Sequence, residues 1–209
     1  MDAAGDPGRE RRPRSDGVRS RTTILAAAAG LATVEGLDGL SIGRLAEHVG
    51  MSKSGLYAHF GSKEELQIAT VDTAREIFDR EVTRRAATAA EGLARLHATC
   101  EAFLDYLERQ VFPGGCFFVS AAVELDAKQG RVPDHLRDVY SELLGDLVAQ
   151  ALAAVEQGEL APATDVEQLV FELDSLMLGA NVAFTFFKDP SAPDRARTGI
   201  AARLEAARA

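Results

Sequence analysis

The sequence predicts an all-α protein of about nine helices, with a small N-terminal unit joined to a larger helical body. Two observations lead to this prediction. Apolar residues recur at spacings of three and four through most of the chain, as they do on one face of an α-helix. Only one apolar run, residues 116–125, also fits a buried strand, and because no second strand exists to pair with it, we interpret it as a buried helix.

The first helix is expected over residues 19–35. The preceding residues 1–18 are mostly Gly, Pro, Asp and Arg with almost no apolar side chains, a composition typical of a flexible basic arm. Apolar residues at helical spacing begin after this arm and stop at Gly36, which is a common residue just beyond a helix end.

Two short helices and one long helix follow. Ser41 is placed to cap the first short helix, which ends at Gly50, and Ser52 is placed to cap the second. The sequence Ser-Lys-Glu-Glu at 62–65 has the form of a capping box, in which Ser and Glu satisfy free backbone N–H groups. We therefore expect a long helix to begin here and to continue to about residue 85.

The rest of the chain is expected to form the helical body. Gly and Pro residues break it into segments whose apolar side chains again recur at helical spacing. The predicted helices cover about 93–111, 116–125, 133–157, 165–187 and 192–206.

Charge is distributed unevenly along the chain. The net charge of −9 argues at first sight against a nucleic-acid partner. Residues 9–63, however, hold nine basic and five acidic residues, whereas the chain from residue 66 onward holds 14 basic and 23 acidic residues. A basic N-terminal unit on an acidic body is compatible with DNA binding by the N-terminal unit alone.

The two short helices have the layout of a helix-turn-helix. They are joined by a turn that contains Gly50, and the second helix is short enough to enter a major groove about 12 Å wide. Its N-terminal end presents Ser52, Lys53, Ser54 and Gly55, where free N–H groups and the helix dipole favour a phosphate. The pattern alone is weak evidence, because many helical bundles contain consecutive short helices.

A longer string of residues is more specific. Residues 37–42 read Leu-Asp-Gly-Leu-Ser-Ile, and residues 56–66 contain Leu-Tyr-x-His-Phe-x-x-Lys-Glu-x-Leu. Over residues 20–66 the chain closely resembles the DNA-binding domain of TetR-type transcriptional repressors. The remaining two-thirds is similar to that family only in its layout, an all-helical body of matching length.

This resemblance implies roles for eight residues of the N-terminal unit. Ser41 would anchor the DNA backbone at the start of the supporting helix. Base edges and nearby phosphates would meet Ser52, Lys53, Ser54 and Gly55, and flanking phosphates would be bound by Tyr57, His59 and Lys63. Because the arms vary within that family, the resemblance assigns no role to the Arg-rich segment from Arg9 to Arg21, which is either a further DNA contact or a solubilising tail.

The resemblance also implies that the chain divides into parts with separate functions and that it forms a dimer. The expected parts are a basic arm at 1–18, a DNA-binding domain at 19–66 and an effector-binding and dimerisation domain at 67–209. A homodimer would place two recognition helices on a palindromic operator. We expect its interface in the helices at 133–157 and 165–187, whose wide aliphatic faces suit a four-helix bundle, although the same faces also suit the chain's own core.

A small-molecule effector is expected in the middle of the body. Members of the resembled family enclose a pocket there, and the aromatic residues of this region suit a small apolar or amphipathic molecule. The alternative is that these side chains are ordinary core, and that Cys116 is a buried and inert thiol rather than a sensing one. The candidate residues are His97, Cys100, Phe103, Tyr106, Cys116, Phe117, Met177 and Phe184.

Other classes of protein fit the sequence poorly. A nucleophile such as Cys116 with His97 or His135 as base is conceivable, but the motifs of phosphate loops, zinc proteases and hydrolase elbows are absent from the sequence, and we expect neither catalytic residues, metal nor cofactor. The longest uncharged run has 14 residues, too few for a membrane span of about 20, so we expect a cytoplasmic protein. A regulator that binds DNA constitutively, without an effector, remains the alternative.

Overall fold

The computed structural model of the chain describes the backbone of residues 14–209 and the side chains of residues 21–209. This part of the chain is all-helical, with nine helices and no strand, which confirms the predicted fold class. Residues 1–13, and with them most of the predicted basic arm, lie outside the described residues. The helices are α1 (Arg14–Glu35), α2 (Ile42–Val49), α3 (Lys53–Phe60), α4 (Lys63–Phe78) with its extensions η1 (Asp79–Thr83) and α5 (Arg84–Ala86), α6 (Leu93–Glu108), α7 (Phe117–Leu125), α8 (Arg131–Glu156), α9 (Val166–Thr185) and α10 (Ala192–Ala206).

The first helix begins earlier than the sequence predicts. It starts at Arg14 rather than at about residue 19, so the end of the predicted flexible arm is helical. The prediction placed the boundary at the first apolar residues. The preceding segment contains a Ser-Asp pair, which is a common sequence at helix starts and needs no apolar neighbour.

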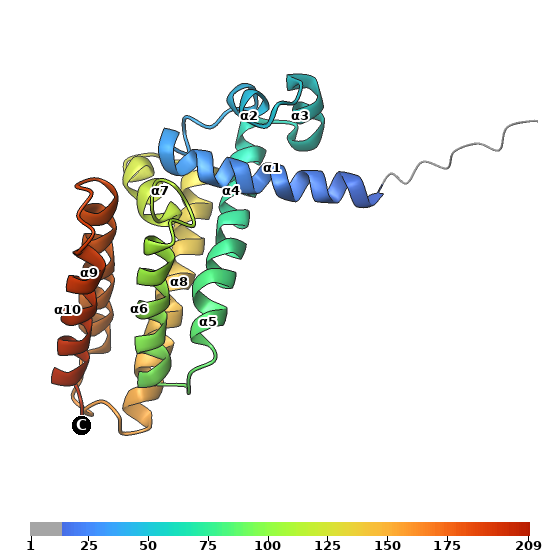
Figure 1. Ribbon diagram of the computed structural model, residues 1–209. Coiled ribbons are helices and arrows are strands. Elements are labelled where there is room, and N and C mark those ends of the chain that lie inside the picture. The colour runs from blue at the N-terminus through green and yellow to red at the C-terminus, as the bar shows by residue number, and fades with distance from the viewer. Residues whose placement is uncertain (1–13) are drawn as a thin grey trace, which may run out of the picture.

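The helices form a head and a body (Figure 1). The head consists of α1, α2 and α3, which pack around the start of α4. The long α4 runs from the head down into the body, where α4 packs against α8, its extensions η1 and α5 pack against α6, and α6 packs against α8. Helices α9 and α10 pack together on the far side of α6 and α8, away from α4.

The long helix that starts at Lys63 contains a local widening. It continues to Ala86, close to the predicted end, but residues Asp79–Thr83 form a π-helical turn. A π turn carries one more residue per hydrogen-bonded ring than an α turn, and such turns occur often at functional sites. This turn follows Phe78, whose ring packs against Phe103, Tyr106 and Phe118 in the body.

One continuous apolar core runs through the body and into the head. The predicted buried helix at 116–125 is confirmed as α7, with Phe117 and Phe118 among the most deeply buried side chains. The apolar face of α8 also lies in this core, because α8 packs against α4, α6, α7 and α9. Within the described part of the chain, every helix is too short or too polar to cross a bilayer.

Candidate nucleic-acid interface and effector cavity

Local hydrogen bonds fix the two short helices of the head. The Ser41 hydroxyl accepts a hydrogen bond from the backbone N–H of Arg44 at 3.3 Å, and Ser52 Oγ accepts one from the N–H of Gly55 at 3.1 Å. Between the helices, Gly50 adopts φ +69°, a left-handed conformation that few other residues tolerate. These caps and this turn form the predicted helix-turn-helix.

The exposed face of α3 carries the residues that the resemblance assigns to DNA. Leu56 and Phe60 point into the core, whereas Ser52, Lys53 and Ser54 are exposed at the N-terminal end. Tyr57 is 59% exposed despite its large ring. A largely exposed aromatic side chain on this face is available to a DNA backbone.

Gly55 and Ser41 have local structural roles in addition. A Cβ atom on Gly55 would lie 3.1 Å from the Ser52 hydroxyl, so a larger residue would press on the cap of α3. The Ser41 hydroxyl is occupied by its capping bond to Arg44. Both residues shape the two helices, whatever they contact on DNA.

Two basic residues of the head region make hydrogen bonds within the protein itself. Lys63 Nζ donates to the backbone carbonyl of Asp38 at 2.6 Å and lies 3.6 Å from the Asp38 carboxylate. Arg21 donates to the carbonyl of His59 at 2.6 Å, and its guanidinium lies 4.7 Å from the centre of the Phe60 ring. Arg21 therefore ties α1 to the C-terminal end of α3, a role that neither reading of the arginine-rich segment predicted.

The turn between α1 and α2, residues 36–40, connects the head to the body. The carboxylate of Glu124, in α7, accepts hydrogen bonds from the N–H groups of Leu37 at 2.6 Å and Asp38 at 3.0 Å. Lys128 pairs with the Asp38 carboxylate at 2.8 Å, which together with Lys63 holds the pKa of that carboxyl below its usual range. We call this set of contacts the α7 clamp.

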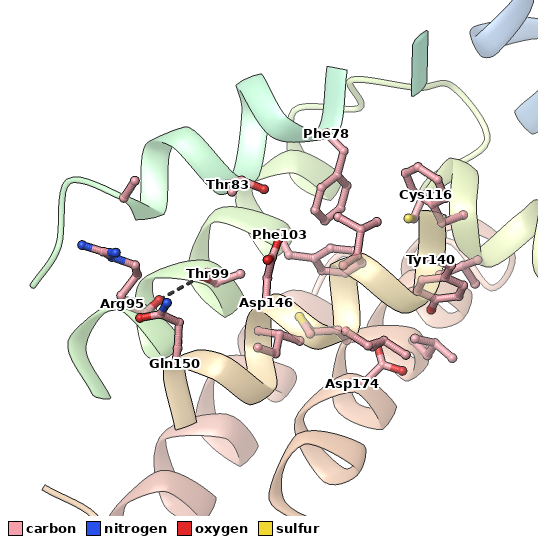
Figure 2. A pocket seen from close by; sticks show the side chains of 18 residues that line it. Phe78, Thr83, Arg95, Thr99, Phe103, Cys116, Tyr140, Asp146, Gln150 and Asp174 are labelled. Atoms are coloured by element: carbon pink, nitrogen blue, oxygen red, sulfur yellow. Dashed lines mark hydrogen bonds between the residues drawn. The ribbon is translucent and has the colours of Figure 1, made fainter. Parts of the chain in front are cut away.

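A cavity of about 190 Å³ opens in the body between the end of α4, α6, α7, α8 and α9 (Figure 2). Aromatic rings form one side of it, and a polar region with Thr83, Arg95 and Gln150 lies toward the other side. Its volume compares with the ~150 Å³ of an engineered apolar cavity that binds benzene. The π-helical turn contributes Thr83, so the widening of the long helix lies at the cavity wall.

The cavity includes some of the predicted effector residues and not others. Phe103, Cys116 and Met177 line it. Cys100, Tyr106 and Phe117 are buried in the surrounding core without lining it. His97 and Phe184 line two other, more open hollows on the surface of the body.

Burial fixes the state of the two cysteines. It raises the pKa of the Cys116 thiol to about 11 and that of Cys100 to about 12. Both thiols are therefore protonated at neutral pH and are poor nucleophiles. For Cys116 this agrees with the alternative that an apolar neighbourhood makes the thiol unreactive.

The sequence-based list omits several lining residues, of which Asp174 differs most from its surroundings. Phe78, Phe118 and Tyr140 contribute aromatic rings, and Asp174 contributes the carboxylate (Figure 2). A signal for Asp174 exists in the sequence, because an acid stands on the helical face that carries Val170 and Met177. Burial raises the pKa of Asp174 to about 6.

Comparisons with known proteins cover both parts of the chain. A family model described as bacterial regulatory proteins of the tetR family matches residues 24–70, and one described as the tetracyclin repressor-like C-terminal domain matches residues 92–200. The first match covers the head and the second covers most of the body. Together they confirm the family that the residues of the head resemble.

Individual relatives are transcriptional regulators. The HTH-type transcriptional activator FasR of Mycolicibacterium smegmatis is 31% identical over 106 residues, which are 51% of this chain and 47% of FasR, so the match spans about half the length of that relative. A TetR transcriptional regulator from Chloroflexus aurantiacus J-10-FL is 27% identical, with a TM-score of 0.80 over 91% of this chain and 96% of the other.

A further similar structure contains DNA. The TetR family regulator CifR, as a cysteine mutant complexed with 26-bp operator DNA, is 25% identical with a TM-score of 0.74, over 89% of this chain and 96% of the other. These matches agree with the capped helix-turn-helix and the helical body described above. The chain belongs to the TetR family of bacterial DNA-binding transcriptional regulators.

Proposed function

We propose that this protein is a homodimeric repressor that releases a palindromic operator when a small molecule fills the cavity of the body. The observation that carries the proposal is the position of α7, which contacts the cavity at one end and the head at the other. AibR, a fold neighbour with 22% identity and a TM-score of 0.65, has been crystallised with isovaleryl coenzyme A and operator DNA together.

Helix α7 connects the cavity wall to the DNA-binding head. Cys116, Phe118 and Val119 line the cavity at its start, and Glu124 clamps the turn of the head near its end. An α-helix rises 1.5 Å per residue, so these two ends lie roughly 8–12 Å apart on one stiff element. A ligand that displaces the start of α7 therefore also displaces the α1–α2 turn.

The ligand must also discriminate between two conformations. It shifts the protein toward release only if it binds the non-DNA conformer more tightly. A ligand that moves the α7 clamp in each protomer changes the distance between the two recognition helices. Because both helices must enter successive major grooves, about 34–36 Å apart or a multiple of this, such a change weakens operator binding.

The dimer interface of this proposal lies on α9. The outer face of α9 carries Phe171, Ser175, Gly179, Val182 and Phe186 at helical spacing, all exposed, with Phe171 66% exposed. This stripe combines large apolar residues with small ones, which lets a second helix approach closely. By contrast, the apolar face of α8 that the sequence analysis assigned to the dimer is buried inside the protomer. The proposal therefore keeps the expected helix at 165–187 and leaves out the one at 133–157.

Introducing a charge on the exposed face of α9 tests the dimer. Phe171→Asp is expected to convert the protein to a monomer in sedimentation velocity and to weaken operator affinity by at least about tenfold. Leu152→Asp, on the exposed side of α8, is the matched control. If Leu152→Asp dissociates the dimer and Phe171→Asp does not, the interface lies on α8 and the proposal for α9 is wrong.

Operator binding tests the DNA contacts. Genome-wide recovery of bound DNA identifies the operator, and fluorescence anisotropy then measures affinity at moderate salt. Tyr57→Ala combined with His59→Ala is expected to weaken binding strongly, because Tyr57 lies exposed on α3 and His59 lies in the last turn of the same helix. Unchanged affinity in this double variant contradicts the DNA assignment.

A reporter gene under the recovered operator tests the sign of regulation. Deletion of the regulator is expected to raise expression. Compounds that stabilise the protein in a thermal-shift screen are expected to lower its operator affinity. If cavity-binding compounds leave operator affinity unchanged, the protein acts constitutively and the ligand-responsive proposal fails; if deletion lowers expression, the protein is an activator.

A further inference from the structure

The packing of the body gives no reason for a carboxylate at the position of Asp174. It lies on the inner face of α9, one turn from Val170 and next to Leu173, and it lines the effector cavity. Among the residues that the structure describes, Asp174 has no hydrogen bond or ion pair. A carboxylate that loses water without gaining a partner opposes folding, so an apolar residue here would serve the core better.

No cation of the described protein faces Asp174. Its titratable neighbours are Tyr140 in α8, Cys116 before α7 and Cys100 in α6, and burial keeps all three in their uncharged forms at neutral pH. Figure 2 shows Asp174 at the end of the cavity with Tyr140 and Cys116, away from Arg95. The negative charge at this end is therefore uncompensated.

The other charged residues of the cavity already have partners. Arg95 donates through Nε and an Nη atom to the carbonyl of Ala89, at 3.3 and 3.1 Å. Asp146 lies 3.6 Å from the guanidinium of Arg75. Among the described charged residues of the cavity wall, Asp174 is thus the one without a hydrogen bond or an ion pair.

Tyr140, the aromatic neighbour of Asp174, belongs to a cluster of rings that lines the cavity. The ring of Phe118 lies 5.9 Å from Phe78 and 6.0 Å from Tyr140, measured between centroids. The faces of such rings carry negative charge density and attract cations, and the effect grows where water is excluded. A carboxylate beside aromatic faces is a favourable environment for an ammonium group.

We propose that the cavity binds a small amphipathic organic cation, an amine whose ammonium pairs with Asp174 and whose apolar part lies among the aromatic rings. The volume of about 190 Å³ limits the ligand to roughly a single ring with a short side chain. This inference rests on the proposed function, because it names the ligand class of the same cavity.

Direct binding to the full chain, without DNA, tests the ligand class. The probes are phenylalkylamines with one to four methylene groups, and the matched phenylalkanols and phenylalkanoates, titrated calorimetrically at pH 7.5. At least one amine is expected to bind about tenfold or more tightly than its alcohol, and the carboxylate of equal length more weakly still. In Asp174→Asn, which keeps the shape of the side chain, this preference is expected to disappear while alcohol binding is retained.

Asp138→Asn, an exposed position on α8, controls for the change of net charge and is expected to keep the amine preference. Equal binding of amines and alcohols, a preference for carboxylates, absence of amine binding, or an amine preference that survives in Asp174→Asn each overturns the inference. Operator affinity is measured separately. Amine binding through Asp174 without operator release leaves this inference standing and refutes the ligand-responsive function instead.

Discussion

Replacing Asp174 by Asn is expected to stabilise the protein at alkaline pH. Burial raises the pKa of this carboxyl from its ordinary 3.8 to about 6 in the folded protein. Above pH 6 the carboxylate is ionised in both the folded and the unfolded chain, and its ionisation favours the unfolded chain, where it is hydrated. Asn cannot ionise, so the substitution removes this penalty without changing the shape of the side chain.

The magnitude follows from the shift in pKa. One unit corresponds to about 1.4 kcal/mol, so a rise of roughly two units sets a ceiling of about 3 kcal/mol at pH 8. Asp174 is only half-buried, and contact with solvent lowers this figure to roughly 1–2 kcal/mol. At pH 4.5 the carboxyl is largely protonated in the folded protein, and the gain falls to about a third of its value at pH 8.

Urea unfolding of the wild type and Asp174→Asn at pH 8 and pH 4.5 measures this difference. The free energy of unfolding of the variant is expected to exceed that of the wild type at pH 8, and by much less at pH 4.5. Asp138→Asn is the control, with a change within about 0.5 kcal/mol at both pH values. A destabilised Asp174→Asn, or a gain independent of pH, refutes the reasoning that Asp174 is ionised and without a partner.

Three further predictions concern the head. Gly36→Ala is expected to lower the free energy of unfolding by about 2–4 kcal/mol, because φ is +85° and a Cβ would lie 2.5 Å from Glu124 Oε1; Gly50→Ala, with φ +69° and open space, is expected to lose only about 1 kcal/mol. Glu124→Gln is expected to speed hydrogen exchange of the Leu37 and Asp38 amides by about tenfold, since each loses a charged acceptor, and equal exchange rates would show that the α7 clamp does not hold the turn. Lys63→Ala is expected to reduce the slope of log affinity against log salt by about 1 if Lys63 binds a phosphate; an unchanged slope with weaker binding would assign Lys63 to the turn alone.

The sequence was sufficient to predict the head because its structure depends on neighbours along the chain. Ser41 and Ser52 cap their helices through N–H groups three residues later, and Gly50 makes the turn between them. Such contacts are determined by local sequence. The start of α1 was less predictable, because the helix there precedes the first apolar residue.

The cavity was less predictable because it depends on how distant helices pack. Phe103 and Tyr106 lie one turn apart on α6, yet only Phe103 reaches the cavity. The same holds for Phe117 and Phe118, which are adjacent in the sequence and point to different surroundings. The number of aromatic residues indicates that a core exists, but only the helix arrangement decides which of them leave a space.

The location of the proposed dimer face was also hard to predict from the sequence. Periodicity identifies an apolar face on α8 and on α9, and it does not tell whether another helix of the same chain covers that face. Helix α8 buries its apolar face against four neighbouring helices, whereas α9 keeps a second, outer stripe that includes Phe171 and Phe186. The exposure of this second stripe is the reason why the proposed interface lies on α9.

The departures from ordinary packing in the body gather around one cavity, which argues that the cavity has a function. Asp174 lines it without a partner, and the π-helical turn of the long helix contributes Thr83 to its wall. Of the described side chains, two further polar atoms are buried without a hydrogen bond: Nη1 of Arg75, whose other Nη atom faces the cavity residue Asp146, and the hydroxyl of Tyr106, whose ring packs on the cavity residue Phe78. If these features were only imperfections of folding, they would be scattered through the core. Their common location supports the proposal that the sequence of the body is shaped by a ligand of the cavity as well as by stability.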